Sequence, residues 1–251
     1  MLFSNNILKV IILSPSVHSE VTKKCVENML QENNIKIDAV VFRKIGGLYR
    51  IKEELKLGVL SLIFKIFFKL LIPLISRFFY LEKQNTYRNI KINYVQNFNS
   101  EIALNWIKAR SPDLIVFTGG GILKKELLDI PKLGVLNCHL GVLPKYRGMY
   151  PYVWAILEDE WDQIGCTTHF MDAGIDTGPI LEVFKFKDAI KNYKNIGSYL
   201  EAQIPECLIS SLRLISKNKH NPKNQLESDG IQYFIPHKNL LNEVKNKIDR
   251  R

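Results

Sequence analysis

Short apolar runs alternate with stretches whose apolar residues recur at helical spacing, and this alternation constrains the fold of the chain more than any other feature. In residues 18–33, for example, Val21, Cys25 and Met29 recur every four residues, which indicates one face of a helix. Strands separated by helices are typical of βαβ units in a mostly parallel sheet. The sequence therefore predicts an α/β fold. The predicted strands are residues 7–13, 37–42, 92–95, 114–117, 134–139, 166–171 and 180–186.

Residues 57–80 interrupt this pattern with a long apolar stretch that reads LGVLSLIFKIFFKLLIPLISRFFY. Lys65 and Lys69 lie in its middle, and each would cost about 2.5–3.5 kcal/mol at a bilayer centre. Pro73 adds a break, and Arg77 continues a basic stripe on one helical face. A helical insertion packed on the domain or on a partner subunit is favoured. Peripheral contact with an anionic membrane comes second, and a membrane span is disfavoured.

The last part of the chain predicts a helix followed by a short strand and a charged helical end. Leu200, Ile204, Leu208 and Leu212 form an apolar stripe, and GIQYFIP follows a polar loop. We expect one domain over residues 1–188, which includes the helical insertion, and a helix and strand appendage over residues 189–251.

Composition narrows the class of protein. The chain is 46% hydrophobic and 24% charged, which excludes a disordered protein. Its net charge of +10 favours anionic partners, but no nucleic-acid-binding module is recognisable.

The spacing of cysteines 25, 138, 166 and 207 suits neither a zinc site nor a disulfide framework, and the N-terminus has no signal-peptide pattern. We therefore expect reduced thiols and a cytoplasmic protein.

Asn137 and His139 lie two residues apart on a predicted strand, so their side chains share one face of the sheet while Cys138 points to the other. A Gly- and Pro-containing loop follows directly. Clefts at the carboxyl ends of strands hold ligands in open α/β sheets. An amide and an imidazolium are both hydrogen-bond donors, so the pair is suited to stabilising an oxyanion.

Asp176 lies in the turn DAGIDTGP, where Gly174, Gly178 and Pro179 predict a tight loop. A carboxylate there could keep a nearby histidine protonated and move a proton. The alternative is a residue that only caps the turn, and this alternative is preferred for Asp172.

Together these segments resemble the folate-dependent formyltransferases. The resemblance rests on NCHLGVLPKYRGMYPYVWAI and GCTTHFMDAGIDTGPIL, which carry the Asn-x-His pair, the following Pro-x-Tyr-Arg-Gly loop and the Asp turn of that family. It implies a Rossmann-like sheet, 10-formyltetrahydrofolate as donor, no metal, and catalytic roles for Asn137, His139 and Asp176.

The resemblance also implies where the donor binds. The pterin ring would lie against two backbone segments, one after the fourth strand and one before Asp176, and glycines allow a flat ring to approach the backbone closely. The implied donor-binding residues are Gly119, Gly120, Gly121, Ile122, Leu123, Asp172, Ala173, Gly174 and Ile175.

The chain is most similar to nucleotide-sugar N-formyltransferases, which implies an amino-sugar nucleotide acceptor and a role in surface polysaccharide or lipopolysaccharide biosynthesis. The loop at residues 14–18 lacks the glycines of glycinamide ribonucleotide formyltransferases, and the C-terminal barrel of methionyl-tRNA formyltransferases is not expected. The candidate acceptor contacts are Lys145, Tyr146, Arg147 and Tyr150, with solvated loop residues as the alternative.

Other readings stay open. Glycinamide ribonucleotide, methionyl-tRNA or another small amine could be the acceptor, and the chain could be a folate-binding protein without turnover. A homodimer and a membrane contact through residues 57–80 are also compatible with the sequence, whereas no nucleic-acid partner is expected. His169 could support the site or pack in the core.

Overall fold

A computed structural model describes residues 7–44, 86–186 and 196–250. The predicted insertion at residues 57–80 and the predicted domain boundary at 188/189 therefore lie outside the described residues. Within those ranges, no helix combines the length and the apolar character needed to cross a membrane.

Seven strands form one mixed sheet, in the order β3-β2-β1-β4-β5-β7-β8. The first five in this order are parallel, and β7 and β8 are antiparallel to their neighbours. The α/β fold with a mostly parallel sheet is confirmed. The strands are β1 (Leu8–Ser14), β2 (Ile35–Arg43), β3 (Lys91–Val95), β4 (Leu114–Phe117), β5 (Val135–His139), β7 (Gly165–Phe170) and β8 (Ile180–Lys185).

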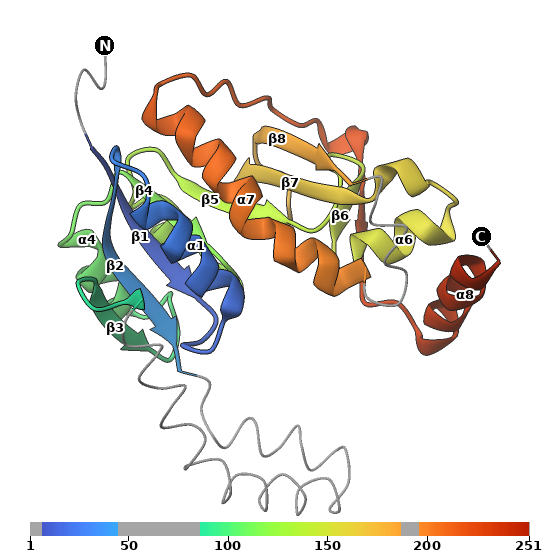
Figure 1. Cartoon of the computed structure of the whole chain (residues 1–251), viewed down its shortest axis with the longest axis horizontal. Coiled ribbons are helices and arrows are strands. Elements are labelled where there is room, and N and C mark those ends of the chain that lie inside the picture. Colours follow the sequence, from blue (N-terminus) through green and yellow to red (C-terminus); the bar gives the residue numbers. More distant parts are fainter. Residues whose placement is uncertain (1–6, 45–85, 187–195, 251) are drawn as a thin grey trace, which may run out of the picture.

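Helices cover both faces of the sheet (Figure 1). Alternate residues of β1 show why: Val10 and Ile12 enter the core beneath α1 (Glu20–Leu30) and α7 (Ile196–Ser216), and Ile11 and Leu13 enter a second core on the other face. Side chains alternate along a strand, so a strand covered on both faces must be apolar throughout. The second core is covered by α4 (Glu101–Lys108) and α5 (Lys125–Leu128).

The chain changes direction across the sheet between β1 and β4, which are neighbours although β2 and β3 separate them in sequence. Hydroxyl contacts of 2.8 Å join Ser14 to Thr22 and Thr22 to Thr118, and so hold the carboxyl ends of both strands together. This is the position where open α/β sheets form a ligand crevice.

The end of the chain returns to the loop that follows β5. There β6 (Tyr146–Gly148) pairs with β9 (Ile231–Tyr233) in a separate two-stranded sheet. This region also holds α6 (Pro151–Leu157), a short 3-10 helix (Trp161–Gln163) and the C-terminal helix α8 (Lys238–Asp249). The predicted appendage is thus joined to the main domain, because α7 shares the core of α1, β9 pairs with β6, and Lys247 of α8 bonds to Asp159.

Candidate functional site

Asn137 and His139 occupy the carboxyl end of β5 and face the same side of the sheet. Together with the segment from Gly148 to Tyr152 they line a pocket of about 370 Å³. Its other walls come from the start of α7, and no Lys or Arg side chain of the described residues lines it. The lining residues are Asn137, Cys138, His139, Leu140, Gly148, Met149, Tyr150, Pro151, Tyr152, Gly197 and Glu201.

The buried His139 ring lies between two acceptors. Its Nδ1 is 3.3 Å from Oδ2 of Asp176, and its Nε2 is 2.8 Å from the carbonyl oxygen of Tyr146. Burial lowers the pKa of His139, while the charge of Asp176 and the Tyr146 carbonyl act in the opposite direction. Because a carbonyl and a carboxylate only accept, the doubly protonated ring is the form in which both nitrogens are satisfied.

Three groups position the Asp176 carboxylate: the Gly148 N–H, the His169 ring and the His139 ring described above. The Gly148 N–H donates to its Oδ2 at 3.0 Å, and Nε2 of His169 is 3.4 Å from its Oδ1. Its backbone adopts the left-handed region, with φ of 54°, which aspartate tolerates better than most residues. Burial disfavours the charged form, but His139 and His169 together hold the pKa of Asp176 at about 2. The carboxylate is therefore ionised at neutral pH.

His169 lies on β7 opposite Asn137 of β5, and the two side chains are in contact. The Phe170 carbonyl accepts from its Nδ1 at 3.1 Å, and its Nε2 lies 3.1 Å from the Asn137 side-chain amide and 3.4 Å from Oδ1 of Asp176. Of the two readings that the sequence leaves open for His169, the structure favours support of the site.

The implied donor-binding residues lie in two loops. Gly119, Gly120 and Gly121 have φ between 111° and 119°, a region that favours glycine, and the neighbouring Ile122 is exposed whereas Leu123 is buried. The second loop, residues 172–175, is exposed. In it the Asp172 carboxylate accepts from the Gly174 N–H and the Thr177 hydroxyl, so its side chain is occupied in capping the turn.

Two of the four predicted acceptor contacts, Tyr146 and Arg147, are buried and bonded to other residues of the chain. Tyr146 is fully buried, and its hydroxyl oxygen lies 2.8 Å from Oε2 of Glu158 and 2.9 Å from Oε2 of Glu160. The exposed fraction of Arg147 is 3%, and its guanidinium donates to Gln225 and to two backbone carbonyls. Both side chains thus bind the protein itself. Lys145 is partly exposed and pairs with Glu160, and only Tyr150 lines the pocket.

No sequence signal marks Gln225, which lies in a polar stretch rich in Lys and Asn. Its Nε2 donates to the carbonyls of Asp176 at 3.1 Å and Gly178 at 2.6 Å, and its Oε1 accepts from Arg147. It therefore links β6 to the backbone that carries the ionised carboxylate. Residues 149–154 are candidates for the acceptor pocket from the sequence, and Tyr152 lies in its wall, whereas no sequence signal marks Glu201, because only the fold brings α7 to this pocket.

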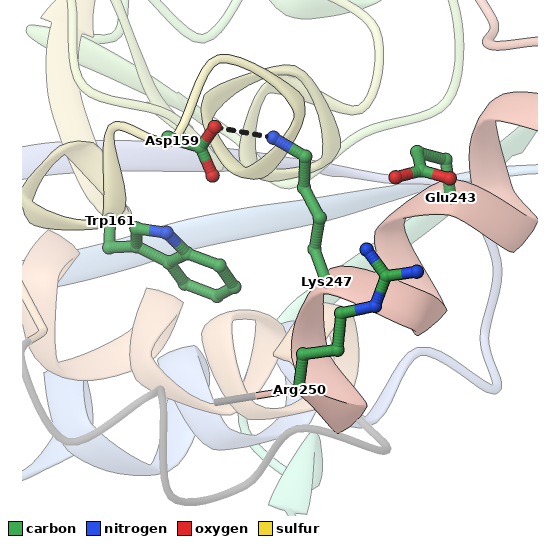
Figure 2. A pocket seen from close by; sticks show the side chains of 5 residues that line it. All are labelled: Asp159, Trp161, Glu243, Lys247 and Arg250. Atoms are coloured by element: carbon green, nitrogen blue, oxygen red, sulfur yellow. Dashed lines mark hydrogen bonds and ion pairs between the residues drawn. The ribbon is translucent and has the colours of Figure 1, made fainter.

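A larger cavity of about 550 Å³ lies between α8 and the end of α6, and shares no residue with the pocket at His139. Its walls carry both signs of charge, and Lys247 donates to Asp159 across it (Figure 2). This mixed lining holds none of the predicted catalytic residues. The lining residues are Asp159, Trp161, Glu243, Lys247 and Arg250.

Comparison with protein families finds a match between residues 78–227 and the formyl transferase family. Among curated proteins, methionyl-tRNA formyltransferase of Clostridium tetani (strain Massachusetts / E88) is 37% identical over 145 residues, which cover 56% of this chain and 46% of that protein. The enzyme of the same name from Pelobacter propionicus is 50% identical over 147 residues, covering 57% and 44%. The chain spans about half the length of the curated relatives it matches.

Among solved structures, a sugar N-formyltransferase from Shewanella sp. FDAARGOS_354 aligns with a TM-score of 0.59 and 17% identity, covering 96% of this chain and 88% of that one. Glycinamide ribonucleotide transformylase 1 from Symbiobacterium toebii aligns with a TM-score of 0.61 and 15% identity, covering 94% and 98%. At this level of identity the alignments show a shared fold.

Proposed function

Because the chain belongs to the formyl transferase family, we propose that it transfers a formyl group from 10-formyltetrahydrofolate to a primary amine. One observation carries this proposal: Asn137, His139 and the ionised Asp176 converge at the pocket on the carboxyl end of β5. A donor amide, a histidine and a carboxylate in contact are the groups that acyl transfer to an amine requires.

In the proposed reaction the uncharged amine attacks the formyl carbon and forms a new C–N bond. The carbonyl oxygen becomes negatively charged, and the Asn137 amide and the protonated His139 stabilise that charge. The intermediate then collapses, the bond to the folate nitrogen breaks, and the proton lost by the amine reaches that nitrogen. No bond to the protein forms at any step.

Asp176 supports this role electrostatically. Its negative charge opposes the effect of burial on His139 and so favours the positively charged ring that the oxyanion needs. Its contact with the Gly148 N–H holds the carboxylate in place.

We propose that the donor binds along the two exposed loops, residues 119–122 and 172–175. The positive φ angles at Gly119–Gly121 favour glycine, and without a Cβ at these positions a flat pterin ring can approach the backbone closely. Because the Asp172 carboxylate is occupied within its own turn, backbone groups of the second loop are the better candidates there.

For the acceptor we propose an amino sugar nucleotide. The pocket beside His139 presents Tyr150, Tyr152 and Glu201, and tyrosine and carboxylate groups suit the hydroxyls of a sugar ring. Since no basic side chain of the described residues lines it, this pocket suits the sugar rather than the phosphates. The product would enter surface polysaccharide assembly.

Methionyl-tRNA is the second candidate, favoured by the curated relatives that share 37% and 50% of the aligned residues. These matches cover less than half of each relative, so they support a common transfer core more than a common acceptor.

An acceptor screen tests both candidates. Purified protein is mixed with 10-formyltetrahydrofolate and, separately, amino-sugar nucleotides, glycinamide ribonucleotide and methionyl-tRNA, and each acceptor is examined by mass for a gain of one formyl group. We expect formylation of an amino-sugar nucleotide by the native protein and none by His139→Ala. Formylated methionyl-tRNA would overturn the sugar proposal. Folate binding without any product would favour a binding protein.

A further inference from the structure

Three of the four cysteines meet behind the catalytic strand. Cys138 lies on β5, Cys166 on β7 and Cys207 on α7, and their sulfur atoms all lie within 4.8 Å of one another. All three are buried, with exposed fractions of 8%, 0% and 2%. We infer that Cys138, Cys166 and Cys207 form a site for one thiophilic d10 metal ion, zinc(II) or copper(I).

The sulfur triangle has the size that such an ion requires. A zinc–sulfur bond is about 2.3 Å, so three sulfurs around one ion in a plane lie about 4 Å apart. The separations of up to 4.8 Å therefore need only a small contraction. Thiolates are soft ligands, and they select zinc and copper(I) over magnesium and calcium.

The electrostatics of the cluster also favour a cation. Cys138, Cys166 and Cys207 all belong to the apolar core on that side of the sheet. A thiolate in an apolar core is costly without a positive partner. Among the described residues, no hydrogen bond or ion pair brings a cationic side chain to these sulfurs. A metal ion would supply the missing charge.

Metal binding at this site changes the proton content of the protein. Bonds form between the ion and three thiolate sulfurs, and each cysteine that was a thiol releases its proton to solvent. No electron is transferred. Cys166 would also give up its weak contact, at 3.8 Å, with the Leu200 carbonyl. Affinity should therefore rise with pH.

The place of the site ties it to the strands that carry the functional side chains. Cys138 lies between Asn137 and His139, and Cys166 is on the strand that carries His169. An ion held by all three sulfurs would cross-link β5, β7 and α7. We therefore expect it to stabilise the fold, whatever reaction the other face performs.

The test measures metal binding by the full, reduced, metal-free protein without oxygen. Native mass spectrometry with added Zn²⁺ in one arm and Cu⁺ in the other should show one ion per chain in at least one arm. Thermal unfolding should shift upward by roughly 5–10 °C at a free ion concentration a hundredfold above Kd. The arm that binds at lower free concentration identifies the ion. No stoichiometric binding in either arm would overturn the inference, and the three cysteines would then be core packing alone.

Two variants locate the ion. Cys166→Ala should weaken binding by about a hundredfold or more, because two sulfurs remain where three are needed. Cys25→Ala is the matched control, since Cys25 is equally buried but lies on α1 and outside the cluster. Circular dichroism establishes that both variants fold. Equal loss of binding in the two variants, or none in Cys166→Ala, would contradict the assignment.

Discussion

The two faces of β5 and β7 differ in how their polar groups are used. On one face, Asn137 and His139 line a pocket, and His139 and His169 contact the ionised Asp176. On the other face, Thr168 binds Ser211 of α7 at 2.7 Å inside the core, and Cys138 meets the cysteines of β7 and α7. One face therefore holds groups in reach of a ligand, and the other fastens the sheet to a helix.

The largest expected effect is on turnover from the pocket face. His139→Ala should lower kcat by about a hundredfold or more, because the proposed reaction loses its charged stabiliser of the oxyanion. Donor binding, measured by titration with tetrahydrofolate, should change little. Asn137→Ala should lower kcat to a similar extent. Near-normal turnover of His139→Ala would show that this face is not the reacting one.

A second effect, on stability, depends on pH. The folded-state pKa of Asp176 is about 2 and lies below that of an unfolded aspartate, so the unfolded state binds more protons between these values. The carboxylate thus contributes about 2 kcal/mol above pH 4, and this contribution is lost as the pH falls toward 2.

Asp176→Asn should lower the free energy of unfolding most at pH 6 and progressively less in acid, as measured by denaturant titration. Asp172→Asn in the same loop is the control, because its carboxylate is exposed and only caps the turn. A pH-independent difference between Asp176→Asn and the native protein would contradict the charge assignment.

The smallest expected effect belongs to the opposite face. Thr168→Val removes the hydroxyl contacts with Ser211 at 2.7 Å and with the Glu182 carbonyl at 3.4 Å, and Ser211 keeps its bond to the Glu182 carboxylate at 2.6 Å. The free energy of unfolding should fall by about 1 kcal/mol, and kcat should stay within about threefold of native. If kcat fell as far as in His139→Ala, the separation between the two faces would not hold.

Local sequence patterns predicted most of the fold. The alternation of apolar runs placed the strands of the sheet within a few residues, and strand parity placed Asn137 and His139 on one face and Cys138 on the other. Residues 45–85 stay outside this comparison, since the structure does not describe them.

Long-range contacts explain what the sequence did not show. Tyr146 and Arg147 look like solvated loop residues until β9 and Gln225 cover them. The cysteines also show what sequence spacing misses. Their spacing along the chain suits no known metal motif, although the sulfur atoms of three of them lie within 4.8 Å of one another. Residues that are far apart in the sequence come together here because β5, β7 and α7 pack against one another.

The pairing of β6 with β9 has a consequence for protein synthesis. Gly148 holds the Asp176 carboxylate through its N–H, and a side chain at this position would lie 2.2 Å from the carbonyl oxygen of Tyr233. That carbonyl in turn accepts from the Met149 N–H at 2.9 Å. Since translation proceeds from the N-terminus, the ribosome finishes the whole central sheet before it adds residues 231–233. A nascent chain therefore remains without its complete site until that short strand emerges from the exit tunnel.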